Sequence, residues 1–266
     1  MKCNNCGVLY NSDFPVGDGY SETFSEHYYK VVQSEAFKPE YLNIEKDPSY
    51  GLFKSILIKV QDIMNPDNRD LLEVGYGRGV FLKTAIQNGW NVSGVDISED
   101  ACDFVQKHVT PNVFAGEFDS LEIKNNSVDA VFFWDSIEHI DKPVDYLNKA
   151  YNIIKKDGVL VITTDEFSSF LGKLSTLLYI FSFGFIKYPV KKYFISYNSF
   201  YFTKKYLENI LSEIGFTILN IEGIDYPISK INLNIFERLI LRIIYLLGKI
   251  TRSESQLLII AQKKIL

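Results

Sequence analysis

The chain has 266 residues, of which 47% are hydrophobic and 15% aromatic, and its formal net charge is −5. This length and apolar content suit one large α/β core and exclude a disordered chain. The acidic balance offers no overall positive field to a nucleic-acid backbone, so we expect no nucleic-acid partner.

The amino-terminal segment carries Cys3 and Cys6 in a single CxxC pair, and the third cysteine is Cys102. Two thiolates are too few for a tetrahedral structural zinc site, so we expect a remnant knuckle without zinc. The sequence does not open on a basic stretch followed by an apolar run, and the charge-free apolar run 174–186 is shorter than the roughly 20 residues of a membrane span. These features favour a cytoplasmic location.

Between about 70 and 164, short apolar runs alternate with amphipathic segments, which is typical of βαβ units feeding a parallel sheet. Strands are predicted at 70–75, 91–96, 112–116, 128–134 and 159–164. Three helices are predicted between these strands. The first ends at Gly89, the second spans 97–109 with Ser98 as its N-cap, and the third runs from Asp141 and Pro143 to a stop at Gly158.

Residues 167–202 are aromatic and interrupt this alternation, so an inserted lid is expected there. A helix at 203–216, strands at 216–224 and 255–264, and an amphipathic helix at 234–250 are predicted to follow. The predicted organisation is an arm over 1–67, a core over 68–166, the lid over 167–202 and the rest of the core over 203–266.

The stretch LLEVGYGRGVFL, residues 71–82, places three glycines after the first predicted strand of the core. Gly75, Gly77 and Gly79 would let the backbone approach a ligand, and the helix that follows offers free N–H groups. A dinucleotide fingerprint would need a glycine or alanine at Val80, so a nicotinamide cofactor is disfavoured.

Two acids narrow the choice of ligand. Glu73 lies at the end of the strand, where a carboxylate repels phosphate and attracts an ammonium group. Asp96 ends the second strand and can accept both ribose hydroxyls of a nucleoside. A nucleoside joined to an amino acid satisfies both acids, and S-adenosylmethionine is such a molecule.

The segments LLEVGYGRGVFL, GVDIS, SVDAVFFWDSIEHIDKPVDYLNKAYNIIKKDGVLVITT and YFTKKYLENILSEIGFTI resemble, in this order, class I S-adenosylmethionine-dependent methyltransferases. The resemblance covers roughly 68–225, and the amino terminus is similar to a bacterial branch headed by a zinc ribbon, with the first half of the ribbon missing. It implies a doubly wound, mostly parallel, seven-stranded Rossmann-like sheet with an antiparallel last strand and a helical lid.

The resemblance also implies roles for single residues. Glu73 would bind the amino group of the cofactor, Asp96 the ribose hydroxyls, and Ile97 would lie against the adenine. Ordinary core packing remains an equal alternative for Phe118 and Trp134. The other residues carried over are Gly75, Tyr76, Gly77 and Gly79 beneath the ligand, Glu117 and Phe118 in the adenine pocket, Trp134 at the methionine end, and His27, Tyr28 and Tyr29 in an arm that folds over the cofactor.

The segment WDSIEHI follows the fourth predicted strand, at the edge where open α/β sheets bind ligands. Asp135, Glu138 and His139 stand at i, i+3 and i+4, so one helical turn would project all three from one side. Three alternatives stay open: His139 as a general base assisted by Glu138, a magnesium site of the E-x-x-E-H kind with Asp135 as the first acid, or a purely positioning role.

The function implied is O-methylation of a small molecule or of a bacterial cell-surface glycan precursor. An NAD(P)-dependent oxidoreductase and an inactive module that binds S-adenosylmethionine are the alternatives. The apolar stretch 174–186, with Lys187, Lys191 and Lys192 facing lipid phosphates, could also contact the inner face of a membrane. The sequence sets neither the acceptor nor the oligomeric state.

Overall fold

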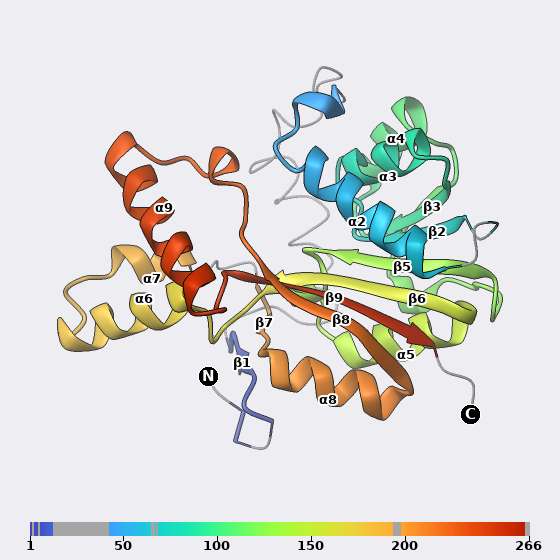
Figure 1. Cartoon of the computed structure of the whole chain (residues 1–266). Coiled ribbons are helices and arrows are strands. Elements are labelled where there is room, and N and C mark those ends of the chain that lie inside the picture. The colour runs from blue at the N-terminus through green and yellow to red at the C-terminus, as the bar shows by residue number, and fades with distance from the viewer. Residues whose placement is uncertain are drawn as a thin grey trace.

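The computed structural model describes residues 1, 3–4, 6–12, 43–64, 67, 69–193 and 198–263. Its centre is a seven-stranded sheet with the strand order β4-β3-β2-β5-β6-β9-β8 (Figure 1). The pairs among β2 to β6 are parallel, and β9 runs antiparallel to both of its neighbours. The strands are β2 (Asp70–Val74), β3 (Asn91–Asp96), β4 (Val113–Ala115), β5 (Val128–Trp134), β6 (Ile154–Asp165), β8 (Phe216–Ile224) and β9 (Gln256–Lys263).

Helices cover both faces of this sheet (Figure 1). One face carries α2 (Tyr50–Ile63), α3 (Val80–Gln87) and α4 (Glu99–His108), and the other carries α5 (Pro143–Ile153) and α8 (Lys204–Ile214). Each face has its own buried apolar cluster. The predicted fold, a doubly wound and mostly parallel sheet of seven strands with an antiparallel last strand, is confirmed.

The central strand β5 shows why the core strands are apolar throughout. Phe132 is fully buried on the α2–α4 side, and Phe133 is buried on the α5 and α8 side. Because successive side chains of a strand point to opposite faces, a sheet covered on both sides needs apolar residues at every position.

The end of α5 differs from its prediction. The helix ends at Ile153 and β6 begins at Ile154, so Gly158 is not the helix stop but lies within the strand. A Cβ added to Gly158 would lie 2.6 Å from the carbonyl oxygen of Asp129 on β5. Glycine there therefore permits the close approach of two strands.

The described part of 167–202, the segment predicted as a lid, includes the helices α6 (Phe170–Phe181) and α7 (Tyr188–Tyr193) and a short strand, β7 (Phe200–Tyr201), that pairs with β1 (Leu9–Tyr10) from the amino terminus. Together with α9 (Ile235–Ile250), α6 and α7 lie beyond the carboxyl edge of the sheet (Figure 1). Among the described residues, no helix combines the length and apolar composition needed to cross a membrane. The described residues also form four short 3₁₀ helices: η4 (Ile44–Lys46), η5 (Phe118–Ser120), η6 (Ile137–His139) and η7 (Ile228–Lys230).

Candidate functional site

The turn between β2 and α3 is a glycine loop with left-handed backbone at all three glycines. The φ angles are 80° at Gly75, 50° at Gly77 and 69° at Gly79. Residues with a side chain rarely adopt this conformation, so the three glycines are required by the path of the chain. The turn is closed by a hydrogen bond of 2.8 Å from the Gly79 N–H to the carbonyl of Tyr76.

Gly75 also permits a close contact with the turn after β5. A Cβ at Gly75 would lie 2.6 Å from the Cβ of Ser136. The Ser136 hydroxyl donates a 2.7 Å hydrogen bond to the carbonyl of Val74. The loops that follow β2 and β5 are therefore packed directly against each other at the carboxyl edge.

Asp96 fixes the conformation of the glycine loop from the neighbouring strand. Its two carboxylate oxygens accept hydrogen bonds from the N–H of Gly77, at 2.8 Å, and of Ser98, at 3.0 Å. A carboxylate has about four lone-pair sites, so these two hydrogen bonds do not use its full accepting capacity. Ser98 caps α4, as predicted, by accepting from the N–H of Ala101.

Glu73 is a buried carboxyl group with 2% of its surface exposed. Its Oε2 has no hydrogen-bond partner within the part of the chain that the structure describes. Burial, and then the negative charge of Asp96, raise the pKa of Glu73 well above its usual range. A ligand cation beside Glu73 would offset both effects, which is the chemistry expected for the ammonium of S-adenosylmethionine. We call residues 73–79 together with Asp96 the glycine-loop half of the carboxyl edge.

Three other residues predicted to bind the cofactor differ in how accessible they are. Tyr76 is buried above Gly94, where a Cβ would lie 2.5 Å from its ring, and its hydroxyl donates to the carbonyl of Phe114. Ile97 and Glu117 are half-buried. Burial is the main cause that raises the pKa of Glu117. Tyr76 thus packs under the glycine loop, whereas Ile97 and Glu117 keep part of their side-chain surface accessible to a ligand.

The two predicted aromatic residues make core contacts. Phe118 is 1% exposed and meets the rings of Phe133 and Tyr146 edge-on. Trp134 is half-buried between Phe53 and Phe81, with ring centroids 4.4 and 5.6 Å away. The packing alternative accounts for these contacts, and a role at the ligand stays a prediction for both.

The amino-terminal predictions are only partly within the described residues. His27, Tyr28 and Tyr29 lie outside them. Cys3 is half-buried, Cys6 is exposed, and Cys102 is buried in α4. Across the described ranges, no three His, Cys, Asp or Glu side chains form a group that could hold a metal ion.

Three acids gather where β5 and β6 end, and we call Asp135, Glu138 and Asp165 the acid-cluster half of the carboxyl edge. Burial, and then the charges of Asp135 and Asp165, raise the pKa of Glu138 well above its usual range. Burial and then Asp135 raise the pKa of Asp165 to about 7. The Oε2 of Glu138, a residue that is 3% exposed, has no partner among the described residues.

The helical turn predicted over Asp135, Glu138 and His139 is wrong. Asp135 precedes η6 and has a left-handed φ of 45°, so it is not on a common helical face with the other two. The chain turns there because Asp135 bonds to β6: its N–H donates to Thr163, and its carboxylate accepts from the Thr163 hydroxyl at 2.9 Å. His139 is half-buried at the end of η6, and its carbonyl accepts from the Ser199 hydroxyl. Within the described residues, the magnesium alternative therefore has no assembled ligand set.

Two amides that the sequence did not single out hold the acids. The side chain of Gln256 donates to Asp135 at 3.2 Å and to Asp165 at 3.4 Å, and Asn198 donates to Asp165 at 3.3 Å. Gln256 faces Asp165 because β9 pairs antiparallel with β6. Glu166 is separate, since its carboxylate accepts from the N–H groups of Ser168 and Lys204 and so holds the start of α8.

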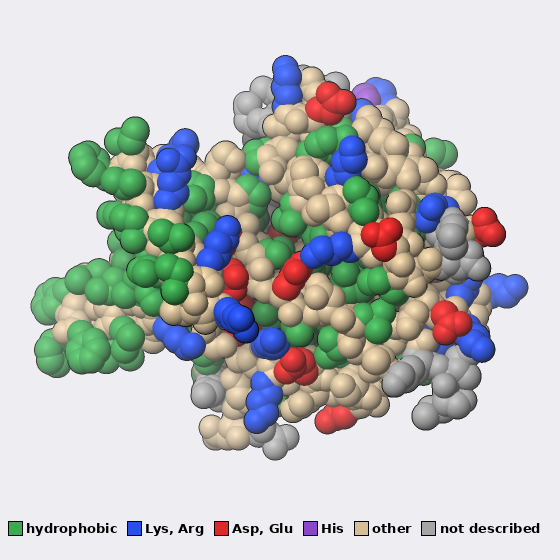
Figure 2. Space-filling view, viewed as in Figure 1, with side chains coloured by type: hydrophobic (Ala, Val, Ile, Leu, Met, Phe, Trp, Pro, Cys, Tyr) green, Lys and Arg blue, Asp and Glu red, His purple; other side chains and the backbone are tan. Residues whose placement is uncertain are grey.

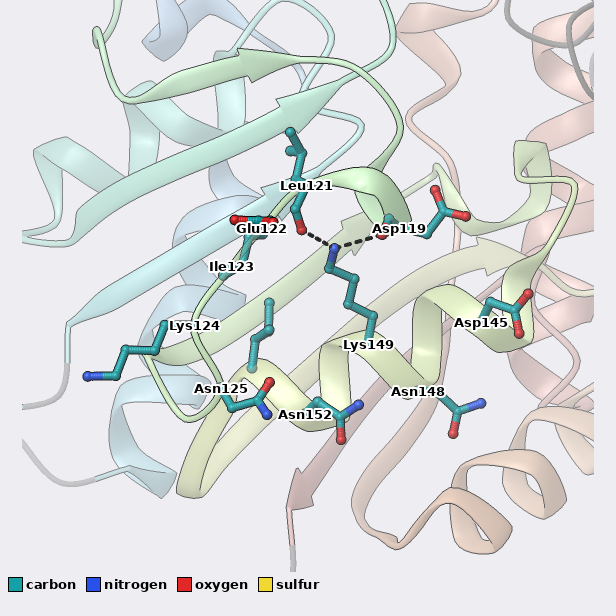
Figure 3. A pocket seen from close by; sticks show the side chains of 11 residues that line it. Asp119, Leu121, Glu122, Ile123, Lys124, Asn125, Asp145, Asn148, Lys149 and Asn152 are labelled. Atoms are coloured by element: carbon teal, nitrogen blue, oxygen red, sulfur yellow. Dashed lines mark hydrogen bonds between the residues drawn. The ribbon is translucent and has the colours of Figure 1, made fainter.

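An open pocket of about 700 Å³ lies elsewhere, between η5 and α5 (Figure 3). The Lys149 ammonium points into its wall and donates to the carbonyls of Asp119 and Leu121. None of the residues predicted to bind cofactor lines this pocket. It is therefore a feature distinct from the carboxyl edge.

Comparisons with known proteins agree with this geometry. The model of a family described as "Methyltransferase domain" matches residues 51–221. Two curated relatives, both named ubiquinone biosynthesis O-methyltransferase, come from Hydrogenovibrio crunogenus and Actinobacillus pleuropneumoniae serotype 7. Each is 23% identical, over 40% and 36% of this chain and 46% and 45% of the relative. The chain thus spans about half the length of the curated relatives it matches.

Two solved structures share the fold. A SAM-dependent methyltransferase from Archaeoglobus fulgidus has a TM-score of 0.57 and 21% identity over 81% of this chain and 95% of its own. Magnesium protoporphyrin IX methyltransferase from Synechocystis PCC 6803, solved with bound SAH, has a TM-score of 0.58 and 14% identity over 89% of this chain and 97% of its own. At these identities the likeness concerns the fold.

Proposed function

The chain belongs to the methyltransferase domain family, and from this premise we propose that it transfers the methyl group of S-adenosylmethionine to a hydroxyl group of a small molecule. The observation that carries the proposal is Glu73, a buried carboxyl group whose Oε2 has no partner among the described residues. A cation is the ligand that such a group favours, whereas the phosphates of a dinucleotide would be repelled. The oxidoreductase alternative is weakened for this reason and by Val80.

The cofactor supplies a methyl group on a positively charged sulfur, which is already a strong electrophile. Glu73 would hold the amino group, and Asp96, already ordered by Gly77 and Ser98, would accept the ribose hydroxyls. The half-buried side chains of Ile97 and Glu117 would line the adenine. Since these groups are fixed before binding, the chain's contribution is orientation and the exclusion of water.

The acceptor proton is the second task of the chain. We assign its removal to His139, which lies beside the acid-cluster half, with Glu138 as a positioning residue. A general base of this kind contributes roughly 10²–10⁴-fold to the rate of proton transfer. The loop after β5 is bonded to Val74 through Ser136, so the base and the cofactor residues share one support.

The preference for a hydroxyl acceptor is supported by the names of the curated relatives, which are O-methyltransferases. A glycan precursor of the bacterial cell surface is the second acceptor class, because the Cys3 and Cys6 segment resembles half of a zinc ribbon. We place the reaction in the cytoplasm, with a small molecule or glycan precursor as the partner.

The test is an assay with S-adenosylmethionine labelled in the methyl group and a panel of hydroxylated aromatic compounds, nucleotide sugars and amines. The proposal predicts label in one hydroxyl class and retention of activity in a Glu122→Gln control, which changes an exposed acid in the pocket between η5 and α5. Label transferred only to amines would overturn O-methylation. Binding of S-adenosylhomocysteine without transfer to any acceptor would favour the inactive binding module.

A further inference from the structure

Two helical segments beyond the carboxyl edge expose most of their large apolar side chains. We call them the apolar arms and define them as residues 170–191 and 235–250. The exposed fraction reaches 93% for Phe183, 90% for Phe185, 80% for Ile235 and 75% for Phe236. Figure 2 shows the apolar side chains gathered over these segments, which protrude from the rest of the molecule. The other exposed members are Leu177, Leu178, Tyr179, Ile180, Phe181, Ile186, Tyr188, Leu239, Ile240, Ile243, Leu246, Leu247 and Ile250.

In the apolar arms, small or polar residues are buried and large apolar residues are exposed, which is the reverse of the usual arrangement in a helix packed on a core. The buried residues of α6 are Gly172 and Ser175, and those of α9 are Tyr245 and Gly248. The two helices pack against each other. A helix normally turns its apolar stripe toward the core. Because the stripe is exposed here, it is available to contact an apolar environment outside the molecule.

The charged residues of the apolar arms indicate which apolar environment this is. The apolar arms contain six lysines and arginines and one acid, Glu237, although the whole chain has a formal net charge of −5. The Glu237 carboxylate is engaged, because it accepts from the Asn234 N–H and the Tyr188 hydroxyl. A cationic surface that surrounds exposed apolar side chains is complementary to an anionic lipid headgroup layer.

The spacing along α9 fits an interfacial helix. Arg238, Arg242 and Lys249 are four and seven residues apart, so at 3.6 residues per turn they form one row. All three are exposed, and this row lies beside the stripe that runs from Ile235 to Ile250. Long cationic side chains at the border of an apolar stripe can reach headgroups while their stems lie along the acyl region.

We propose that the apolar arms dock the protein on the surface of an anionic lipid bilayer, with the tip at Phe183 and Phe185 inserted among the acyl chains. Gly184, with φ of 81°, makes the turn that presents these two rings. Because the arms lie beyond the carboxyl edge, docking turns that edge toward the bilayer (Figure 1). An acceptor carried by the bilayer would then meet the cofactor residues, a consequence that rests on the function proposed above.

The experiment is co-sedimentation of the full chain with vesicles of phosphatidylcholine alone or mixed with phosphatidylglycerol. We expect binding to the mixed vesicles, weakened by salt because exposed charges are screened. The double variant Phe183→Ser/Phe185→Ser should lose about tenfold or more in partitioning, since it removes two apolar anchors. Arg238→Gln/Arg242→Gln should lose the preference for the anionic lipid.

Matched controls on the α/β body separate these effects from general ones. Ile58→Ser changes an exposed apolar residue of α2, and Lys54→Gln/Lys107→Gln removes two exposed cations. Both should bind vesicles as the parent does. Absence of sedimentation with mixed vesicles at low salt overturns the proposal. So does a concentration-dependent dimer, seen by light scattering, that the Phe183 and Phe185 changes abolish while vesicle binding is unaffected. Binding of S-adenosylhomocysteine, measured on the same samples, reports separately on the proposed function.

Discussion

The glycine-loop half and the acid-cluster half of the carboxyl edge hold their carboxyl groups by different means. Asp96 is fixed by two backbone N–H groups from segments next to it, the glycine loop and the cap of α4. Asp135 and Asp165 are held by side chains, chiefly the amide of Gln256, from a strand about a hundred residues away. Asp96 is therefore held in a cradle of backbone N–H groups, whereas Asp135, Glu138 and Asp165 are neighbouring acids, and burial and then the charge of Asp135 raise the pKa values of the other two.

The largest expected effect tests whether proton removal takes place beside the acid-cluster half, at His139. His139→Ala should lower kcat by roughly 10²–10⁴-fold with cofactor affinity nearly intact, because the loss is confined to the transition state. Steady-state kinetics with the acceptor that the labelling assay identifies give the measurement, with His108→Ala as the control. Turnover like that of the parent enzyme would exclude the base. Loss on EDTA treatment and recovery with magnesium would favour the metal alternative.

Asp96→Ala tests the backbone cradle. It removes the acceptor of two backbone N–H groups and of the ribose hydroxyls, and each charge-assisted hydrogen bond is worth about 1.5–3 kcal/mol. Affinity for S-adenosylhomocysteine should fall by at least about tenfold in a calorimetric titration. The exposed acid of α4 gives the control Asp103→Ala. An unchanged affinity would mean that Asp96 orders the loop without contacting the ligand.

The pH dependence of the stability of the folded chain tests the acid-cluster half. The pKa of Asp165 rises from 3.8 to about 7, so between these values the folded chain holds a proton that the unfolded chain releases. The stability from this group is complete below about pH 4 and is lost as the pH rises through about 7. Asp165→Asn should raise the melting temperature by about 2–8 °C near pH 8 and change it little near pH 4.

The control for this prediction is Asp119→Asn, which changes an exposed acid. It should have the same small effect at both pH values. An Asp165→Asn variant that is destabilised at the higher pH would show that the carboxylate is stabilised there by its neighbours.

The smallest effect is expected at the amino terminus. Cys3→Ser with Cys6→Ser should leave the melting temperature nearly unchanged, and the purified, tag-free protein should contain well under one zinc per chain, because the pair provides two of the four ligands of a structural site. Elemental analysis and thermal unfolding are the measurements. Stoichiometric zinc would contradict this and indicate ligands from another chain.

The sequence predicted the contiguous parts of the molecule well for a physical reason. The glycine loop and the Ser98 cap each act within a few residues, and their conformations follow from local sterics and hydrogen bonds. Asp96 bonds to the glycine loop from the adjacent parallel strand, a position that the βαβ pattern of the sequence predicts. The resemblance to the methyltransferase family also predicted the number of strands and the antiparallel last strand.

The long-range parts could not be predicted from the sequence. Gln256 meets Asp165 only through the register of β9 on β6, and Gly158 serves an approach to Asp129 that no local pattern encodes. The stripe of α9 was predicted as an amphipathic helix, but periodicity does not reveal whether a core or another phase covers it.

The central claim is that Glu73 binds the amino group of the cofactor, and a titration of S-adenosylhomocysteine into Glu73→Gln beside the parent protein tests it most directly. The parent should bind one ligand per chain, with affinity that increases with pH, because a carboxyl group of raised pKa has to release its proton to pair with the ammonium. Glu73→Gln should bind at least about tenfold more weakly, because it removes the charge that pairs with the ammonium. Its melting temperature should be undiminished, because the glutamine side chain has a similar shape and carries no buried charge. Equal affinity in Glu73→Gln, or binding of NADH in place of S-adenosylhomocysteine by the parent, would contradict the account.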